Sequence, residues 1–159
     1  MNTGLERYIN FLESISDSVP ESVAEVVAPH VHFRDPFNDL HGIAAYKLVI
    51  ADMCENLAGL SITITHASEI QARDRESLSL AVIRWELSGN LIAFRHKPWR
   101  TQGYAELAFS DDQRLSRHFD YWDAAGGLYE HLPVIGGLCR WVRRRLAVRF
   151  EDAVESAAQ

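Results

Sequence analysis

Hydrophobic residues recur with two different periods along the first 122 residues of this chain. In three early segments they fall every three or four positions, which predicts helices over residues 5–15, 20–29 and 43–57. A short alternating run from Val31 to Asp35, closed by Pro36, predicts a strand between the second and third helices, and residues 38–42 predict a turn after it.

The period changes to two after Gly59. Apolar and polar residues alternate in four runs that predict strands over residues 60–72, 77–87, 99–109 and 115–122. Polar turns at residues 88–90 and 110–113 connect neighbouring runs, as in an antiparallel meander. Helices followed by a meander predict an α+β fold whose helices cover one face of an antiparallel sheet.

Helical spacing returns from Ala124 to about Phe150, with breaks at Pro133 and at Gly136–Gly137. We expect one domain over residues 1–132 and a helical extension over 133–159 that packs on it.

Residues 133–150 hold five arginines and no acidic residue, so this segment carries +5 and the rest of the chain −11. An apolar face of Leu138, Trp141, Val142 and Leu146 beside these arginines is typical of a helix on a membrane surface or an acidic partner. The alternative, which we favour, is packing on the acidic body of this chain or of a second copy.

Composition narrows the classes of function. The 159 residues, 47% of them hydrophobic and 24% charged, suffice for one packed core. A net charge of −6 without a basic stripe on the predicted sheet argues against nucleic-acid binding. Cys54 and Cys139 are too few for a disulfide framework. The N-terminus has no signal-like pattern and no apolar run approaches the roughly 20 residues of a membrane span, so we expect a cytoplasmic protein.

Two sequence motifs, and their order along the chain, are informative about the fold. The first is Val31-His32-Phe33-Arg34-Asp35-Pro36-Phe37, followed by Gly42 and a helix, and the second runs from Gly103 to Phe109 and on to Asp120-Tyr121-Trp122. Over residues 4 to 125 the chain resembles the nuclear-transport-factor-2-like superfamily, and within it the SnoaL-like and ketosteroid-isomerase-like proteins. The resemblance implies a cone-shaped, curved antiparallel sheet wrapped by the N-terminal helices, with a largely apolar pocket at its open end. It also implies a homodimer and chemistry that needs no cofactor.

Asp35 matches the general-base aspartate of the ketosteroid isomerases, a carboxylate whose chemistry needs an apolar setting such as Phe33 and Phe37 would supply. The alternative is that Asp35 only caps the turn that follows it. The rest of the isomerase apparatus is missing, since Phe11 stands at its hydrogen-bonding tyrosine and Ala105 at its protonated aspartate. Tyr8, one helical turn before Phe11, is a candidate substitute. Loss of both oxyanion donors argues against steroid isomerisation by the standard route.

A second constellation lies on the last predicted strand. Strand alternation places His118, Asp120 and Trp122 on one face, and Trp122 matches a pocket-lining tryptophan of the isomerases. In SnoaL-like cyclases an aspartate on a late strand is the acid/base group, which makes Asp120 the match, with His118 to orient it or relay a proton. The alternative is a buried His–Asp pair that only ties the fold together.

The remaining candidates are weaker. His30, His32, His41, His66, His96 and His131 show no metal-ligand spacing, so we expect no metal site. The hairpin before Trp99 is unusually long, and Trp99 is a candidate for the mouth of the cavity. We therefore expect a protein that binds a small hydrophobic or amphipathic molecule and, if it is an enzyme, an isomerase, cyclase or hydrolase. The alternative is a non-catalytic binding or regulatory dimer whose Arg-rich helix contacts a partner or a membrane surface.

Overall fold

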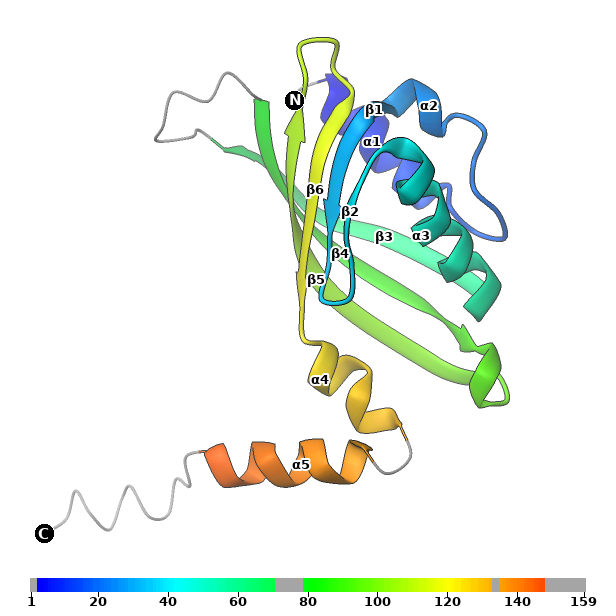
Figure 1. Ribbon diagram of the computed structural model, residues 1–159, viewed down its shortest axis with the longest axis vertical. Helices are drawn as coiled ribbons and strands as arrows, with labels where there is room; N and C mark the ends of the chain where they lie inside the picture. The colour runs from blue at the N-terminus through cyan, green and yellow to red at the C-terminus, as the bar shows by residue number, and fades with distance from the viewer. Residues whose placement is uncertain (1–2, 71–78, 133–134, 148–159) are drawn as a thin grey trace, which may run out of the picture. The chain divides into compact units, whose positions relative to one another are not determined.

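The computed structural model describes residues 3–70, 79–132 and 135–147. By its internal contacts the chain divides into a first unit, Met1–Trp122, and a second, Asp123–Gln159, so the division falls ten residues before the predicted start of the extension. The first unit holds the three N-terminal helices and the sheet (Figure 1), together with the hydrophobic core.

The first unit follows the predicted order of helices and then strands, with some changes of boundary. Its elements are α1 (Thr3–Glu13), α2 (Val23–Val26), β1 (Val27–Arg34), β2 (Asp39–His41), α3 (Ile43–Asn56), β3 (Leu57–Ile70), β4 (Ser79–Leu91), η1 (Ile92–Phe94), β5 (Lys97–Phe109) and β6 (Leu115–Trp122).

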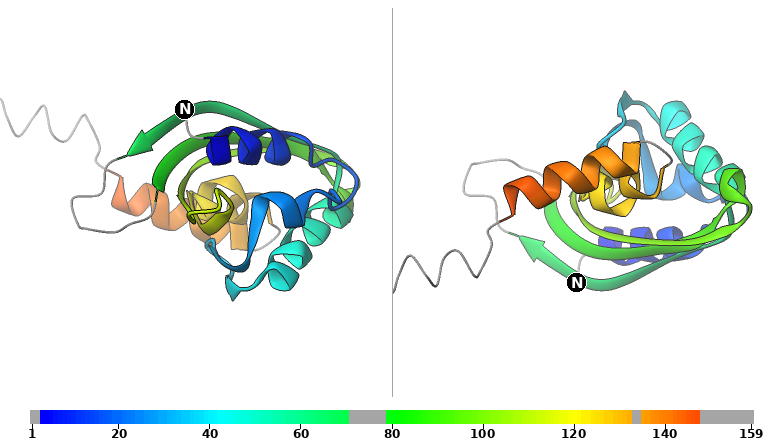
Figure 2. Two further views of the ribbon diagram at one scale, coloured as in Figure 1. Left: turned by 90° about the horizontal axis from the view of Figure 1, so that it is seen from above. Right: turned by 90° about the horizontal axis from the view of Figure 1, so that it is seen from below.

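Six strands form one sheet in the order β2-β1-β6-β5-β4-β3. All neighbouring pairs are antiparallel except β1 and β6, which run parallel, so the sheet is mixed rather than purely antiparallel. The sheet curves strongly and does not close on itself (Figure 2). Its two edge strands, β2 and β3, are both contacted by α3, which follows β2 in the chain and therefore bridges the open side.

The concave face of the sheet carries the core. Along β4 every second residue is buried, with Ala81, Ile83, Trp85 and Leu87 on the inner face. The buried side of α1, formed by Leu5, Tyr8, Phe11 and Leu12, packs onto this face, and Tyr8 meets Phe109 of β5 edge to face. The hydrophobic stripe predicted for the first helix is therefore confirmed, and it fixes which face of the sheet is interior.

Several predicted boundaries were wrong. The turn predicted over residues 88–90 lies inside β4, which pairs with β5 as far as Leu91. The second helix ends at Val26 and the chain continues as β1, so Pro29 lies inside a strand instead of ending a helix. The pairing of β1 with β6 is interrupted between Val27 and His32, and a proline without an N–H is tolerated at such an interruption. The turn predicted over residues 38–42 contains the short strand β2, which pairs back onto β1. Residues 71, 72, 77 and 78, predicted as strand, lie outside the described residues.

The second unit is helical, as the spacing predicted. It contains α4 (Ala124–Gly127), η2 (Tyr129–His131) and α5 (Ile135–Leu146). Asp123 caps α4 by accepting from the Gly126 N–H, and Arg143 of α5 makes ion pairs with Asp123 and with Glu130 of η2. These contacts hold the elements of this unit together. No described helix is both long and apolar enough to cross a bilayer.

Candidate functional site

His118 and Asp120 project from the inner face of β6. His118 is buried, with 4% of its surface exposed, while the side chain of Asp120 keeps 16% exposed. The His118 Nε2 atom lies 2.9 Å from Asp120 Oδ1, but no hydrogen bond to Nε2 has acceptable geometry. The imidazole and the carboxylate are therefore in close contact without a well-aligned hydrogen bond.

Two tyrosine hydroxyls connect to the other side of this imidazole. The Tyr8 hydroxyl from α1 lies 2.6 Å from His118 Nδ1 and 2.6 Å from the Tyr46 hydroxyl on α3. Both tyrosines are fully inside the core, where an unpaired hydroxyl would be costly. Three elements distant in sequence thus contribute one continuous chain, Tyr46–Tyr8–His118–Asp120.

When Asp120 is ionised, one arrangement of protons satisfies the donors and acceptors of these four side chains best. Tyr46 donates to Tyr8, Tyr8 donates to His118 Nδ1, and the proton of the neutral imidazole then sits on Nε2, facing Asp120. The opposite tautomer would point the Nε2 lone pair at a carboxylate and leave the Tyr46 proton without an acceptor among the described residues. A second proton on His118 would place an N–H on Nδ1, which would reverse both tyrosine hydrogen bonds.

The two tyrosines act only as neutral hydrogen-bonding groups. Burial raises the pKa of Tyr8 well above its ordinary value, and the neighbouring Tyr46 and the charge of Asp120 raise it further. Burial also raises the pKa of Tyr46, with Asp120 adding to the effect. Neither hydroxyl ionises near neutral pH, so any negative charge among the four linked side chains resides on Asp120.

Trp85 fixes Asp120 from the opposite side. Its indole Nε1–H donates to Asp120 Oδ1 at 2.8 Å, although Trp85 lies on β4 and Asp120 on β6, with β5 between them. The indole can cross β5 because the inner face of that strand carries Gly103 and Ala105. A Cβ atom on Gly103 would lie 2.6 Å from Trp85 Cζ2, so the glycine is required by this crossing. No described residue hydrogen-bonds Asp120 Oδ2, which leaves that oxygen for an external group.

Aromatic rings follow Asp120 along the inner face. Trp122, two residues further along β6, meets Phe37 with ring centroids 5.6 Å apart and Trp99 at 6.4 Å. Deeper in the core, Phe33 packs against both His118 and Tyr46, and Phe11 stacks on Tyr8. The predicted lining residues Phe11, Phe33 and Trp122 therefore surround the polar chain on its apolar sides.

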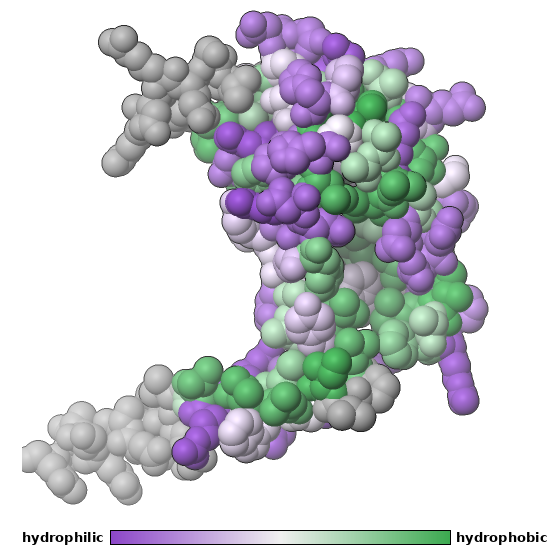
Figure 3. Space-filling model, in the orientation of Figure 1, coloured by the Kyte–Doolittle hydropathy of each residue, from purple (hydrophilic) through white to green (hydrophobic). Residues whose placement is uncertain are grey.

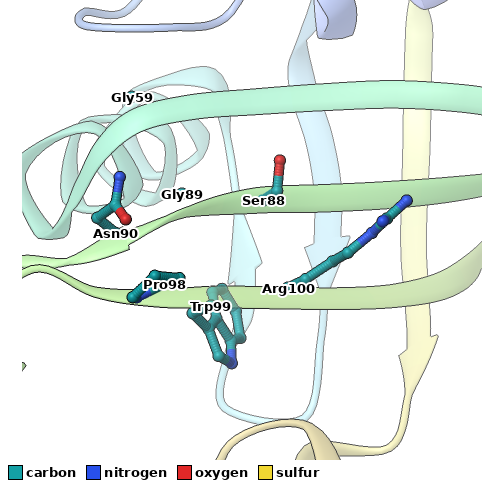
Figure 4. Close-up of a pocket in the computed structure, with 7 residues that line it drawn as sticks. All are labelled: Gly59, Ser88, Gly89, Asn90, Pro98, Trp99 and Arg100. Carbon is teal, nitrogen blue, oxygen red and sulfur yellow. The ribbon is translucent and has the colours of Figure 1, made fainter.

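An open pocket lies away from these four linked side chains, at the start of β3, the end of β4 and the start of β5 (Figure 4). Trp99 lines it, beside Gly59, Ser88, Gly89, Asn90, Pro98 and Arg100. Neither His118 nor Asp120 is among its lining residues. Of the residues predicted to bind substrate, Trp99 is thus shared between the aromatic group at Trp122 and this pocket.

The Asp35 carboxylate is engaged in its own turn. Its Oδ1 atom accepts from the backbone N–H groups of Phe37 and Asn38, at 2.7 and 2.6 Å, and the Asn38 side chain donates to both oxygens. None of these hydrogen bonds involves Tyr8, His118 or Asp120. The geometry favours the turn-capping role over the acid/base role for Asp35.

Sequence reasoning paired His118 with Asp120 and proposed Tyr8 in place of the missing tyrosine, and the structure brings all three together. It did not identify Tyr46 and Trp85 as members of the site. A buried tyrosine needs a hydrogen-bond partner for its hydroxyl, and a buried tryptophan needs one for its N–H. This requirement was the signal in the sequence that could have pointed to both residues.

Comparison with known proteins identifies relatives of the whole first unit. The family model of the SnoaL-like domain matches residues 6–118. TsrD from Streptomyces laurentii has a similar structure, with a TM-score of 0.65 and 16% identity over 84% of this chain and 97% of that one. A comparison with curated proteins found no match.

Two further similar structures belong to enzymes or candidate enzymes. A candidate SnoaL-like polyketide cyclase from Jannaschia sp. CCS1 has a TM-score of 0.60 at 11% identity, over 77% of this chain and 85% of that one. SalBIII, an epoxide hydrolase/cyclase-like enzyme in pyran ring formation of the polyether salinomycin, also has a TM-score of 0.60, at 10% identity over 76% and 88%. At these identities the likeness shows the fold, which a curved, unclosed six-stranded sheet with covering helices also shows.

We predict that Gly103→Ala displaces Trp85 from Asp120. The added methyl group would press on the indole and on Trp122 Cβ, 2.8 Å away, and such overpacking costs about 1–3 kcal/mol. The free energy of unfolding should fall, and tryptophan fluorescence should shift as the indole loses its hydrogen bond. Gly137→Ala is the control, because nothing lies within 4 Å of its added Cβ in α5, and it should be neutral or stabilising. An unchanged fluorescence spectrum in Gly103→Ala would contradict the assigned packing.

We predict different effects for two substitutions of Asp35. Asp35→Ala should destabilise the protein by about 1–2 kcal/mol, because the N–H groups of Phe37 and Asn38 lose their acceptor. Asp35→Asn keeps an acceptor oxygen and should lose much less. Urea denaturation of the two variants measures the difference. Equal stability of Asp35→Ala and the wild type would show that the turn does not depend on this side chain.

Proposed function

The chain belongs to the SnoaL-like domain family, and on that premise we propose that it is an enzyme of acid/base chemistry. Its reaction is an isomerisation, cyclisation or hydrolysis of a small hydrophobic or amphipathic molecule, and it needs no cofactor. Asp120 is the group that exchanges a proton with the substrate. His118 is its positioning and relay residue.

One observation carries this proposal, namely a carboxylate with one oxygen fixed and the other unbonded at the border between core and surface. Trp85 and His118 hold Oδ1, and Oδ2 has no hydrogen bond from any described residue. A structural ion pair of the same burial would be expected to use both oxygens. One indole donor on Oδ1, an imidazole 2.9 Å from the same oxygen and an unbonded Oδ2 suit a group that gains and loses a proton.

The proton step follows from the arrangement. Asp120 Oδ2 takes a proton from the substrate, and the carboxyl group that forms no longer attracts the Nε2–H of His118. When the proton returns to another atom of the substrate, or to water, the contact at 2.9 Å is restored. The Tyr8 hydroxyl keeps the imidazole oriented throughout, because it bonds Nδ1.

The apolar residues define the substrate class. Phe33 packs against His118, Trp99 packs against Trp122, and the small Ala105 lies directly opposite Asp120 on β5. Such walls favour an uncharged carbon skeleton. The chemistry named for the Jannaschia protein and for SalBIII falls in the same class and supports this proposal. Asp35 has no acid/base role in it, and the homodimer stays a prediction.

We predict that Asp120→Asn abolishes turnover with little loss of stability. The amide keeps an oxygen for the Trp85 N–H but cannot take a proton, and removal of a general acid/base group typically costs about 10²–10⁴ in rate. The assay follows, by NMR in D2O, deuterium incorporation next to the carbonyl in a panel of cyclic ketones, and ring opening in a panel of hydrophobic epoxides.

The control is Glu106→Gln, which removes a carboxylate from the outer face of β5, where Glu106 pairs with Arg117. It should keep the wild-type rate. Wild-type activity that survives in Asp120→Asn, or no activity of the wild type on either panel, would contradict the proposal.

A second candidate function rests on α5. Its large apolar side chains are exposed, including Leu138 at 62%, Trp141 at 61% and Leu146 at 77% (Figure 3). Arg143 is paired within the second unit, whereas Arg144 and Arg145 make no ion pair with any described residue. A binding module that docks this helix on an anionic surface would use those two arginines.

For this second candidate we predict binding to vesicles of phosphatidylserine and phosphatidylcholine that weakens as salt is raised. Each arginine near such a surface contributes about 1 kcal/mol, so replacing Arg144 and Arg145 together by Gln should weaken binding about thirtyfold. Trp141→Ala should weaken it as well, while Arg95→Gln, in the β4–β5 hairpin, should not. Failure of the wild type to sediment with these vesicles would exclude a lipid surface as the partner.

A further inference from the structure

The hairpin of β1 and β2 gathers three metal-ligating side chains outside the proposed active site. His32 and His41 are direct partners across the two strands, and their rings stack with centroids 4.0 Å apart. Asp39 stands two residues before His41 on the same side of β2, and its Oδ1 atom lies 2.6 Å from His32 Nε2. One ligand atom of each residue lies within 4.8 Å of the other two.

We propose that His32, Asp39 and His41 bind a divalent transition-metal ion such as Zn²⁺, Co²⁺ or Ni²⁺. Two imidazole nitrogens and one carboxylate oxygen form a ligand set that these borderline metals prefer, whereas Mg²⁺ and Ca²⁺ prefer oxygen ligands throughout. Three protein ligands leave further positions for water. The site goes beyond the proposed function and does not depend on it.

The backbone prearranges this set. Cross-strand pairing fixes the two histidines opposite each other, and the hairpin turn after Arg34 is held by the hydrogen bonds of Asp35 to Phe37 and Asn38. Phe119 of β6 packs edge-on against the His32 ring at 4.7 Å and limits its rotation. Little side-chain freedom therefore remains to be lost when a metal ion binds, and only small movements bring the three atoms to bonding distance.

Charged side chains on the hairpin both favour and oppose the binding of a cation. The exposed Asp39 carboxylate attracts a cation. Arg34, the cross-strand partner of Asp39, opposes a cation, but its guanidinium lies over the Phe119 ring and donates to the Tyr121 hydroxyl. Asp39 and His41 are exposed and His32 is half-buried, so an ion can reach the site from solution.

The site lies on the opposite side of β1 from the acid/base chain. Strand alternation turns His32 outward and Phe33 inward, and it is Phe33 that packs against His118 and Tyr46. A metal ion held by His32 would therefore be one strand away from Asp120 and outside its reaction. It would brace the edge of the sheet where β2 ends.

The test is a titration of the full chain, freed of any histidine tag and treated with chelator, with Zn²⁺ by calorimetry and with Co²⁺ by visible absorption. We expect one equivalent to bind, and saturating Zn²⁺ to raise the thermal unfolding midpoint, since an ion that binds only the folded state stabilises it. His41→Ala and His32→Gln should each weaken binding at least tenfold, as loss of even an indirect support of a metal ligand costs about 10–100-fold.

The control is His66→Ala, an exposed histidine of β3 that should leave binding unchanged. Circular dichroism of each variant checks that it folds, and Asp39→Asn supplies a variant that leaves both rings in place. No binding to the wild type, or binding that is unchanged in His41→Ala and in Asp39→Asn, would overturn the proposal.

Discussion

The interior of the first unit is organised by the need to satisfy one buried imidazole. Among the described residues His118 is the buried polar group of the core. A polar group without a hydrogen-bond partner in such a place reduces the stability of the fold by about 2–7 kcal/mol. Tyr8 and Asp120 occupy the two sides of the imidazole, and each in turn needs a partner of its own. Tyr46 and Trp85 supply those partners, so α1, α3, β4 and β6 are tied to one another through a single polar chain.

Packing along β5 makes this chain possible. Because Gly103 and Ala105 are small at the middle of its inner face, the Trp85 indole can cross β5 and reach Asp120. Ala105 also stands where the isomerase-like pattern has a second acidic group. In the proposed function, Asp120 therefore supplies the acid/base group alone.

The two faces of the sheet carry different groups. The inner face carries the aromatic rings and the polar chain that ends at Asp120. The outer face of β1 and β2 carries His32, Asp39 and His41, and His32 is the residue before the inward-facing Phe33. Because side chains alternate along a strand, the proposed acid/base group and the proposed ion site lie on opposite faces.

The sequence by itself determined the order of helices and strands, the buried stripe of α1, and the placement of His118, Asp120 and Trp122 on one face, because these follow from local periodicity. The β6 boundaries were predicted at both ends, while those of β1 were not, since its pairing with β6 carries the strand past Pro29. The local pattern also offered the turn-capping role of Asp35, whose hydrogen-bond partners are two and three residues away. Only the tertiary structure decided that Tyr46 and Trp85 complete the chain at Asp120 and that His32 meets His41. Each of these depends on contacts between elements distant in sequence or on the register of a hairpin, and no local pattern encodes either.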